Sequence, residues 1–207
     1  MRIIAGTFRS RTLAAPPGMS TRPTSDRLRE TLFNVLAPRI QGAAFLDLYA
    51  GSGAVGLEAL SRGAAHVAFV ERAPAALKVL DANLVRLGIS EAVRIHRKSV
   101  SAFLKSATGP KPTPDKNPKP KENPKTEWHD VLFLDPPYDA AEEYALTLGR
   151  LGVAAQDVLA PGAVVIAEHR RKFALAERYG SLRRTRLLEQ GDAALSFYGI
   201  DTGTRES

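Results

Sequence analysis

The sequence predicts an α/β fold in which a mostly parallel sheet is covered by helices on both faces. From residue 44 to residue 169, short apolar runs alternate with segments of helical spacing. This alternation is typical of parallel sheets with helices packed on each side. The last two apolar runs, 182–189 and 194–200, are joined only by a Gly191-Asp192 turn. Strands connected so tightly must be antiparallel, so we expect one reversed strand near the end of the sheet.

The first 39 residues form a basic extension, which we separate from a main domain at 40–201. They contain seven arginines against two acidic residues. The apolar pairs Ile3–Ile4 and Thr12–Leu13 could join as a hairpin. Ser25 can cap a helix that runs to about Leu36, because its oxygen can accept a hydrogen bond from the first turn.

The main domain is expected to hold five strands before the two terminal ones. Each of the five is a short apolar run, and each helix between them shows apolar residues three or four apart. Gly88 ends the second of these helices. The expected strands are 43–49, 66–71, 93–96, 130–135 and 163–169, and the helices are 55–62, 74–87, 99–105 and 140–151.

A segment at about 106–128 interrupts this pattern. It carries six prolines and five lysines, and no aliphatic residue larger than Ala107. Such a composition cannot bury a core. We therefore expect a disordered or polyproline-like insertion here.

Composition excludes several classes of chemistry. The chain has no cysteine, which removes disulfides, thiolate metal sites and cysteine nucleophiles. The four histidines show no metal-ligand spacing, so no metal is expected. There is no apolar run of transmembrane length, and we expect a cytoplasmic protein that does not bind membranes. The net charge of +7 favours a polyanionic partner such as nucleic acid.

A glycine-rich loop follows the first strand of the main domain and opens a helix. Gly51, Gly53 and Gly56 form a GxGxxG pattern, and Glu71 ends the next strand twenty residues after Gly51. Glycines let a backbone approach a ligand closely, and an acid at that position can bind two ribose hydroxyls. The pattern by itself fits either NAD or S-adenosylmethionine.

Asp47, which lies just before the loop, favours S-adenosylmethionine. A dinucleotide would place its pyrophosphate near this carboxylate, at a cost of roughly 4 kcal/mol for 4 Å and an effective dielectric constant of 20. The ammonium and sulfonium of S-adenosylmethionine are cationic. Asp47 would attract them directly, or it would hold the loop amides and water in place.

The tetrapeptide Asp135-Pro136-Pro137-Tyr138 follows the fourth strand, at the edge where α/β sheets bind ligands. An exocyclic aromatic amine is a poor nucleophile, because its lone pair is delocalised into the ring. The Asp135 carboxylate and the Pro136 carbonyl can accept its two N–H groups and favour a localised lone pair. Pro137 stiffens the loop, and Tyr138 can stack on a base. We therefore predict that these four residues are catalytic, through positioning and electrostatics.

Three segments resemble the RsmD family of small-subunit (16S) rRNA guanine-N2 methyltransferases. They are RPTSDRLRETLFNVL at 22–36, FLDLYAGSGAVGLEALSRGAAHVAFVE at 45–71 and LFLDPPY at 132–138. The resemblance implies the class I, Rossmann-like methyltransferase fold with a seven-stranded sheet. It also implies an RNA-binding enzyme that acts on small-subunit rRNA or on a partly assembled small subunit, and we expect a monomer.

The resemblance also implies roles for individual residues. Asp47, Gly51 and Gly53 would contact the methionine end of the cofactor and Glu71 its ribose, with Arg22 and Thr24 near the incoming base. Many class I enzymes have an aspartate near position 99 for the adenine amino group, where this chain has Ser99. We therefore expect the adenine contact from the Ser99 hydroxyl, which is a weaker acceptor, or from the Val100 backbone N–H. The further contacts that we predict are Tyr49, Ala50, Ser52 and Arg72 for the cofactor, and Arg27 and Tyr138 for the substrate.

Three other functions remain open on the sequence alone. DPPY is also found in adenine-N6 methyltransferases, so DNA adenine methylation is an alternative, although no separate target-recognition domain is visible. A non-catalytic RNA-binding assembly factor could keep the same fold. A nicotinamide oxidoreductase could use the same glycine loop.

Overall fold

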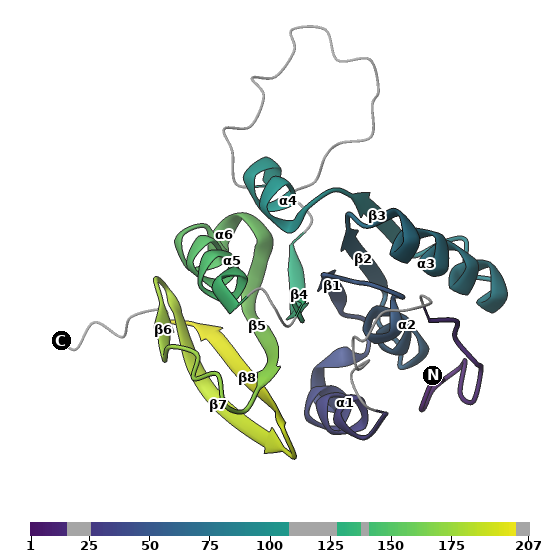
Figure 1. Ribbon diagram of the computed structural model, residues 1–207, viewed down its shortest axis with the longest axis horizontal. Coiled ribbons are helices and arrows are strands. Elements are labelled where there is room, and N and C mark those ends of the chain that lie inside the picture. Colours follow the sequence, from purple (N-terminus) through teal and green to yellow (C-terminus); the bar gives the residue numbers. More distant parts are fainter. Residues whose placement is uncertain (16–25, 108–127, 138–140, 202–207) are drawn as a thin grey trace, which may run out of the picture.

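Eight strands form one mixed sheet at the centre of the computed structural model, which describes residues 1–15, 26–107, 128–137 and 141–201 (Figure 1). The strand order is β3-β2-β1-β4-β5-β8-β7-β6. The strands are β1 (Ala44–Leu48), β2 (His66–Glu71), β3 (Val93–Arg97), β4 (His129–Leu134), β5 (Leu159–Arg170), β6 (Arg178–Tyr179), β7 (Leu182–Gln190) and β8 (Ala193–Ile200).

The first five strands are parallel, with β1 between β2 and β4. Leu48, the last residue of β1, pairs with Val70 on one side and with Leu134 on the other. On β5, Ala167 pairs with Leu134. The carboxyl ends of these strands therefore meet at one edge of the sheet, which is where open α/β sheets bind their ligands.

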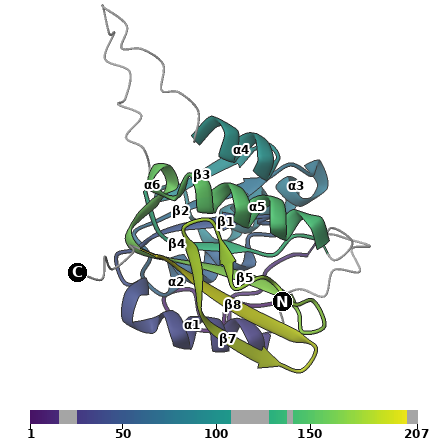
Figure 2. The same ribbon diagram turned by 90° about the vertical axis from the view of Figure 1, so that its left-hand side faces the viewer.

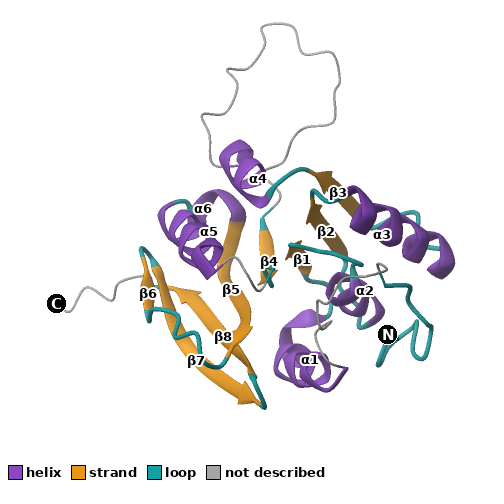
Figure 3. Ribbon diagram, in the orientation of Figure 1, coloured by secondary structure: helices purple, strands orange, loops and turns teal. Residues whose placement is uncertain are grey.

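The sheet has eight strands, so the expected count of seven is corrected by one. The additional strand, β6, is only two residues long and pairs antiparallel with β7 across the turn at Gly180 and Ser181. A strand this short shows no measurable alternation, and the sequence pattern could not reveal it. Both β8 and β6 run against the parallel strands, whereas one reversed strand was expected. The three strands β6, β7 and β8 form one side of the sheet (Figure 3).

Helices cover both faces of the sheet and bury two hydrophobic cores (Figure 2). The first core includes α1 (Asp26–Ile40), α2 (Ala54–Ser61) and α3 (Pro74–Leu87). The second includes α4 (Val100–Ala107), α5 (Ala141–Val153) and α6 (Ala155–Val158). Successive strand residues alternate between the cores: Phe45 lies in the first and Leu46 in the second. This two-sided burial explains why the central strands are continuous apolar runs.

The boundaries differ from the expected ones mainly where the pattern was short. β2 and α3 have the expected bounds. α1 continues four residues past Leu36 and includes Pro38. β5 begins at Leu159 and so includes Gly162, and the four-residue helix α6 before it was not expected. Most of the predicted insertion, residues 108–127, lies outside the described residues.

Residues 1–15, which we call the N-terminal arm, fold back on themselves as the apolar pairs predicted. Arg2 and Thr12 form an antiparallel bridge, and the Ile3 amide donates to the Arg11 carbonyl at 3.0 Å. Ile3 and Leu13 are buried in the first core. The arm therefore packs on the same core as the sheet, and the domain boundary at 39/40 remains a prediction.

A buried glutamate of α2 anchors the arm. The carboxylate of Glu58 accepts hydrogen bonds from the Ile4 and Ala5 amides at 2.8 and 3.0 Å, and from Arg62 Nε at 2.7 Å. The Arg29 side chain of α1, also fully buried, lies with its Nε 3.7 Å from Glu58.

Within the described residues, no helix has the length and apolar character needed to cross a membrane.

Candidate active site

The glycine loop, residues 49–53, leaves the carboxyl end of β1 with an unusual backbone. Tyr49, Gly51 and Gly53 all have positive φ, of 64°, 56° and 81°. The positive φ at Gly53 favours glycine, and a Cβ there would lie 2.3 Å from Leu80 Cδ1, so that side chain would have to move. At Gly56 a Cβ would lie 2.3 Å from a Phe69 ring carbon. The GxGxxG pattern therefore permits the sharp turn and the close packing of α2 on β2.

Asp47 is almost fully buried, with 2% of its surface exposed. Its Oδ2 accepts a hydrogen bond of 2.9 Å from the Gly56 amide, in the first turn of α2. Burial raises the pKa of Asp47 to about 7, opposed by the Gly56 hydrogen bond and assisted by the negative charge of Glu71. A cationic group would therefore be favoured beside Asp47, and a pyrophosphate would not.

Glu71 joins the glycine loop to the turn after β2. Its Oε2 accepts from the Gly51 amide at 2.9 Å, and its Oε1 accepts from the Arg72 and Ala73 amides, each at 2.7 Å. A carboxylate offers about four lone-pair sites. Glu71 can therefore hold the loop in place and still accept a ligand hydroxyl.

Asp135 lies one residue beyond the end of β4. On each strand, residues two apart share a face: Phe45 and Phe133 lie in the first core, two residues before Asp47 and Asp135. Because β1 and β4 are neighbours in the sheet, both carboxyl groups project from the same face at the same edge. Burial, then Glu168 and Asp47, raise the pKa of Asp135 well above its usual value.

Glu168 was missed by sequence reasoning. It follows Ala167, the partner of Leu134, so it comes opposite Asp135 on the neighbouring strand. Only 2% of its surface is exposed, and its charge acts on Asp135. An acid at the carboxyl end of the run AVVIAEH was the available signal, the same one that indicated Asp47 and Asp135.

The other loop positions have more varied surroundings than predicted. The Tyr49 hydroxyl interacts with Glu143 and Thr147 of α5, each at 2.8 Å, so this side chain turns toward the second core. Ser99 Oγ accepts from the Ala102 amide at 3.2 Å and caps α4. Ala50 and Val100 are buried, Ser52 is partly exposed and the Arg72 side chain is exposed.

The predicted catalytic and substrate residues are only partly described. Pro136 is buried and Pro137 is exposed. Arg27 is exposed in the first turn of α1, a helix that contacts the end of β7 through a 3.0 Å hydrogen bond from Thr31 to Gln190. Arg22, Thr24 and Tyr138 lie outside the described residues. Within the part of the chain that the structure describes, no group of histidines and acids could hold a metal.

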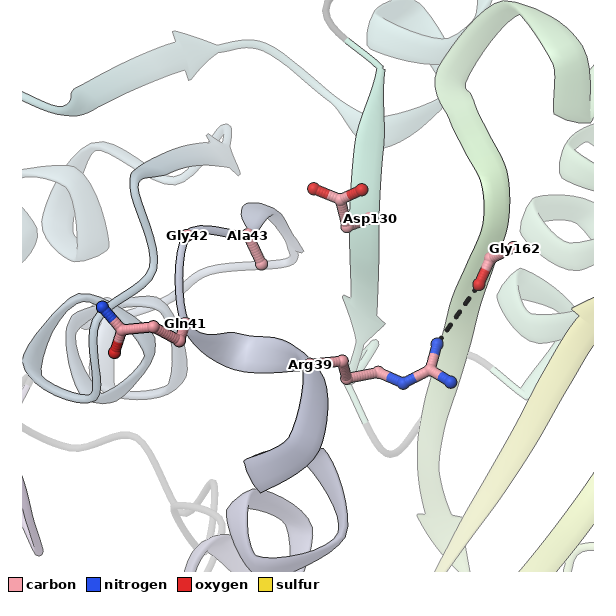
Figure 4. Close-up of a pocket in the computed structure, with 6 residues that line it drawn as sticks. All are labelled: Arg39, Gln41, Gly42, Ala43, Asp130 and Gly162. Carbon is pink, nitrogen blue, oxygen red and sulfur yellow. Dashed lines mark hydrogen bonds between the residues drawn. The ribbon is translucent and has the colours of Figure 1, made fainter.

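A polar hollow lies at the opposite edge of the sheet (Figure 4). One of its lining residues is Asp130, near the start of β4. Asp130 Oδ2 accepts a hydrogen bond from the Ala44 amide at the start of β1, so the hollow lies where these strands begin. Arg39 reaches across to the Gly162 carbonyl at 3.2 Å. This hollow is therefore separate from Asp47, Glu71 and Asp135. Its lining is Arg39, Gln41, Gly42, Ala43, Asp130 and Gly162.

Known proteins resemble the chain, one along nearly its whole length and another along two thirds of it. It is 34% identical over 199 residues to "Putative rRNA methyltransferase YlbH" of Bacillus subtilis. This match covers 96% of this chain and 98% of that protein. It is 42% identical over 138 residues to "Ribosomal RNA small subunit methyltransferase D" of Escherichia coli, a match that spans 67% of this chain but only 60% of that protein.

Solved structures give the same relationship. The structure titled "Putative methyltransferase yhhF from Escherichia coli" superposes with a TM-score of 0.78 at 32% identity and covers 98% of this chain and 99% of that one. The fold is thus that of a methyltransferase, as predicted. The family model described as "Conserved hypothetical protein 95" matches residues 1–199. The chain belongs to this family, which is the RsmD family that its sequence motifs resemble.

Proposed function

We propose that the chain is an S-adenosylmethionine-dependent methyltransferase that modifies the N2 amino group of a guanine in small-subunit rRNA. One relationship carries the proposal: Asp47, the second-last residue of β1, and Asp135, one residue beyond β4, lie on the same face of neighbouring strands, so the acceptor for an amine stands beside the glycine loop. The relatives named "Putative rRNA methyltransferase YlbH" and "Ribosomal RNA small subunit methyltransferase D" support the substrate class.

The residues at this edge fit S-adenosylmethionine. Two carboxylates, Asp47 and Glu71, suit an ammonium and a ribose hydroxyl. A Cβ on Gly51 would meet no atom closer than the Tyr49 carbonyl at 4.0 Å, so the loop is open on that side. Asp47, Gly51 and Gly53 would hold the methionine end and Glu71 the ribose. When bound, the cofactor supplies an electrophilic methyl group on a positively charged sulfur.

The protein's own contribution to the reaction is at Asp135 and Pro136. The carboxylate and the carbonyl accept the two N–H groups of the target amine and so favour a localised lone pair on its nitrogen. When that nitrogen gains a methyl group, it must lose one proton. The raised pKa of Asp135 makes its carboxylate, when ionised, a stronger base for this proton.

RNA binding would rest on exposed cations around the same edge. Arg27 lies in the first turn of α1, and Arg171 and Lys172 follow the end of β5. Contacts from such side chains to phosphate give affinity without base specificity. The partner in this proposal is small-subunit rRNA or a partly assembled small subunit, bound by a monomer.

The test is methyl transfer from labelled cofactor to three substrates side by side: unmodified small ribosomal subunits, naked small-subunit rRNA and duplex DNA. Mass spectrometry of the released nucleosides identifies the product. We expect N2-methylguanosine from one or both RNA substrates and no product from DNA. N6-methyladenine in DNA would support the alternative enzyme. Cofactor binding without transfer to any substrate would support a non-catalytic assembly factor.

A further inference from the structure

A buried asparagine lies between the glycine loop and the N-terminal arm. Leu80 and Asn83, three residues apart on α3, point toward the loop from the same face of the helix. Leu80 fills the space above Gly53, and Asn83 Nδ2 donates a 3.0 Å hydrogen bond to the Ser52 carbonyl. α3 therefore supports the loop through one apolar and one polar contact.

The same amide group of Asn83 pairs with the arm. Its Oδ1 accepts from the Ala14 amide at 2.8 Å, and its Nδ2 donates to the Ala14 carbonyl at 3.1 Å. A side-chain amide thus bonds both backbone groups of one residue, as a neighbouring strand would. With the bond to Ser52, the acceptor and both donor hydrogens of Asn83 are engaged.

Burying the amide side chain of Asn83 is costly unless its polar atoms are hydrogen-bonded, so this position favours a specific polar role. The side chain is fully buried, with 0% of its surface exposed, between the core residues Leu80 and Leu84. An apolar residue would pack there, but it would leave the Ala14 and Ser52 backbone groups without these hydrogen bonds. The arm has separate anchors on α2, at Glu58 and Ser61. Asn83 is therefore not required simply to attach the arm.

Side chains hold the glycine loop and the first turn of α2 after it at three points. Glu71 accepts from the Gly51 amide and Asp47 from the Gly56 amide. Asn83 is the donor in this set, and it holds the Ser52 carbonyl between those two points. The two carboxylates are candidates to contact the cofactor, whereas Asn83 acts only through the loop backbone.

We propose that Asn83 is a positioning residue for cofactor binding, which fixes the Ser52 peptide of the glycine loop against the N-terminal arm. The proposal rests on the proposed function, because the ligand of the loop is taken to be S-adenosylmethionine. Loss of the Asn83 amide frees the Ser52 carbonyl, and the loop must then be ordered by the cofactor itself. Cofactor affinity falls by about tenfold, the typical effect of one internal hydrogen bond at its upper range.

The variants are Asn83→Asp, Asn83→Ala and the matched control Ser61→Ala. Asn83→Asp keeps the acceptor for the Ala14 amide and loses both donors, including the one to Ser52. Ser61 Oγ bonds the Ala5 carbonyl and the Phe8 amide, so its removal loosens the arm and leaves the glycine loop untouched. Calorimetry gives the dissociation constants of S-adenosylmethionine and S-adenosylhomocysteine, and urea unfolding without ligand gives the stability of each variant.

We expect a dissociation constant about tenfold higher for both Asn83 variants and within twofold of wild type for Ser61→Ala, even where their stabilities are equally reduced. If the Asn83 variants bind the cofactor as Ser61→Ala does, Asn83 is only a structural residue and the inference is wrong. Where Asn83→Ala does not fold, Asn83→Asp alone decides between these outcomes. Failure of the wild-type protein to bind either ligand would instead overturn the proposed function.

Discussion

The carboxylate of Asp47, at the end of β1, accepts a 2.9 Å hydrogen bond from the backbone amide of Gly56 in the first turn of α2. This contact joins the two ends of the segment that carries the glycine loop. It also keeps a carboxylate where little water reaches it, and burial raises its pKa to about 7. Asp47 therefore changes charge in the neutral pH range. The negative charge of Glu71 raises the pKa of Asp47, and the charge of Asp47 in turn raises the pKa of Asp135.

Cofactor affinity should rise with pH between about 6 and 7.5. The ionised form of Asp47 attracts the cofactor's ammonium, and the protonated form does not. In Asp47→Asn, binding should be weaker, and its dependence on pH should be much reduced over this range. Calorimetric titration with S-adenosylhomocysteine at several pH values measures both effects. An equal pH dependence in wild type and Asp47→Asn would assign the titration to another group.

Without ligand, Asp47→Asn should be more stable than wild type at pH 8. Since the pKa of Asp47 is raised on folding, the native state binds more protons than the unfolded state between about pH 4 and pH 7. Stability is therefore lost as pH rises through that window, by at most about 4 kcal/mol. Asparagine keeps an acceptor for the Gly56 amide and carries no charge. Urea unfolding should show an advantage for Asp47→Asn at pH 8 that shrinks at pH 5, and an advantage independent of pH would contradict this account.

Glu71→Ala should weaken cofactor binding about tenfold or more. The ribose hydroxyls lose a charged acceptor, and hydrogen bonds to charged groups contribute about 1.5–3 kcal/mol each. The Gly51, Arg72 and Ala73 amides also lose their partner. Glu71→Gln retains one carbonyl acceptor and should fall between alanine and wild type. An unchanged dissociation constant in both variants would place the ribose elsewhere.

Glu58→Gln should destabilise the fold by about 3–5 kcal/mol, because it removes the only fully buried carboxylate that pairs with Arg29 among the described residues and leaves the half-exposed Asp26 as its remaining ion-pair partner. It also places an N–H₂ group among the donors of Ile4, Ala5 and Arg62. The matched control is Asp81→Asn, which breaks the half-exposed pair with Arg97 and should cost less than about 1 kcal/mol. Urea unfolding gives the free energy of unfolding of the two variants. If both variants lose a similar amount of stability, the buried contacts of Glu58 contribute no more than an exposed ion pair.

Periodicity and turn residues predicted most of the architecture, because the central strands are buried on both faces. The runs at 66–71 and 130–135 have no competing helical pattern, and Gly88 marks the end of α3 clearly. Very short elements could not be predicted, since β6 and α6 span only two and four residues. β5 extends beyond its apolar run through Pro161 and Gly162, residues that normally interrupt a strand.

The acids of the site were predictable where they follow a strand and a recognisable motif, as Asp47 and Asp135 do. Glu168 also lies near the carboxyl end of a strand, but no recognisable motif marks it. Asn83 looks in the sequence like a polar interruption of an apolar helix face, and its role depends on Ala14 and Ser52, which are distant in the chain. Ser99 was expected to contact adenine, but the structure shows it as the cap of α4, and whether it also contacts the cofactor remains a prediction.

The most direct test of the account is single-turnover methylation by Asp135→Ala and Asp135→Asn. Methylation of unmodified small subunits is followed with labelled cofactor, and cofactor affinity is measured in parallel. Both variants should lose about 10²–10³ in rate, the usual cost of removing one preorganised electrostatic partner. Cofactor affinity should change little, because Asp47 and Glu71 are untouched. A near wild-type rate for Asp135→Asn would show that the carboxylate charge is dispensable, and loss of cofactor binding in both variants would place Asp135 in the cofactor site and contradict its catalytic assignment.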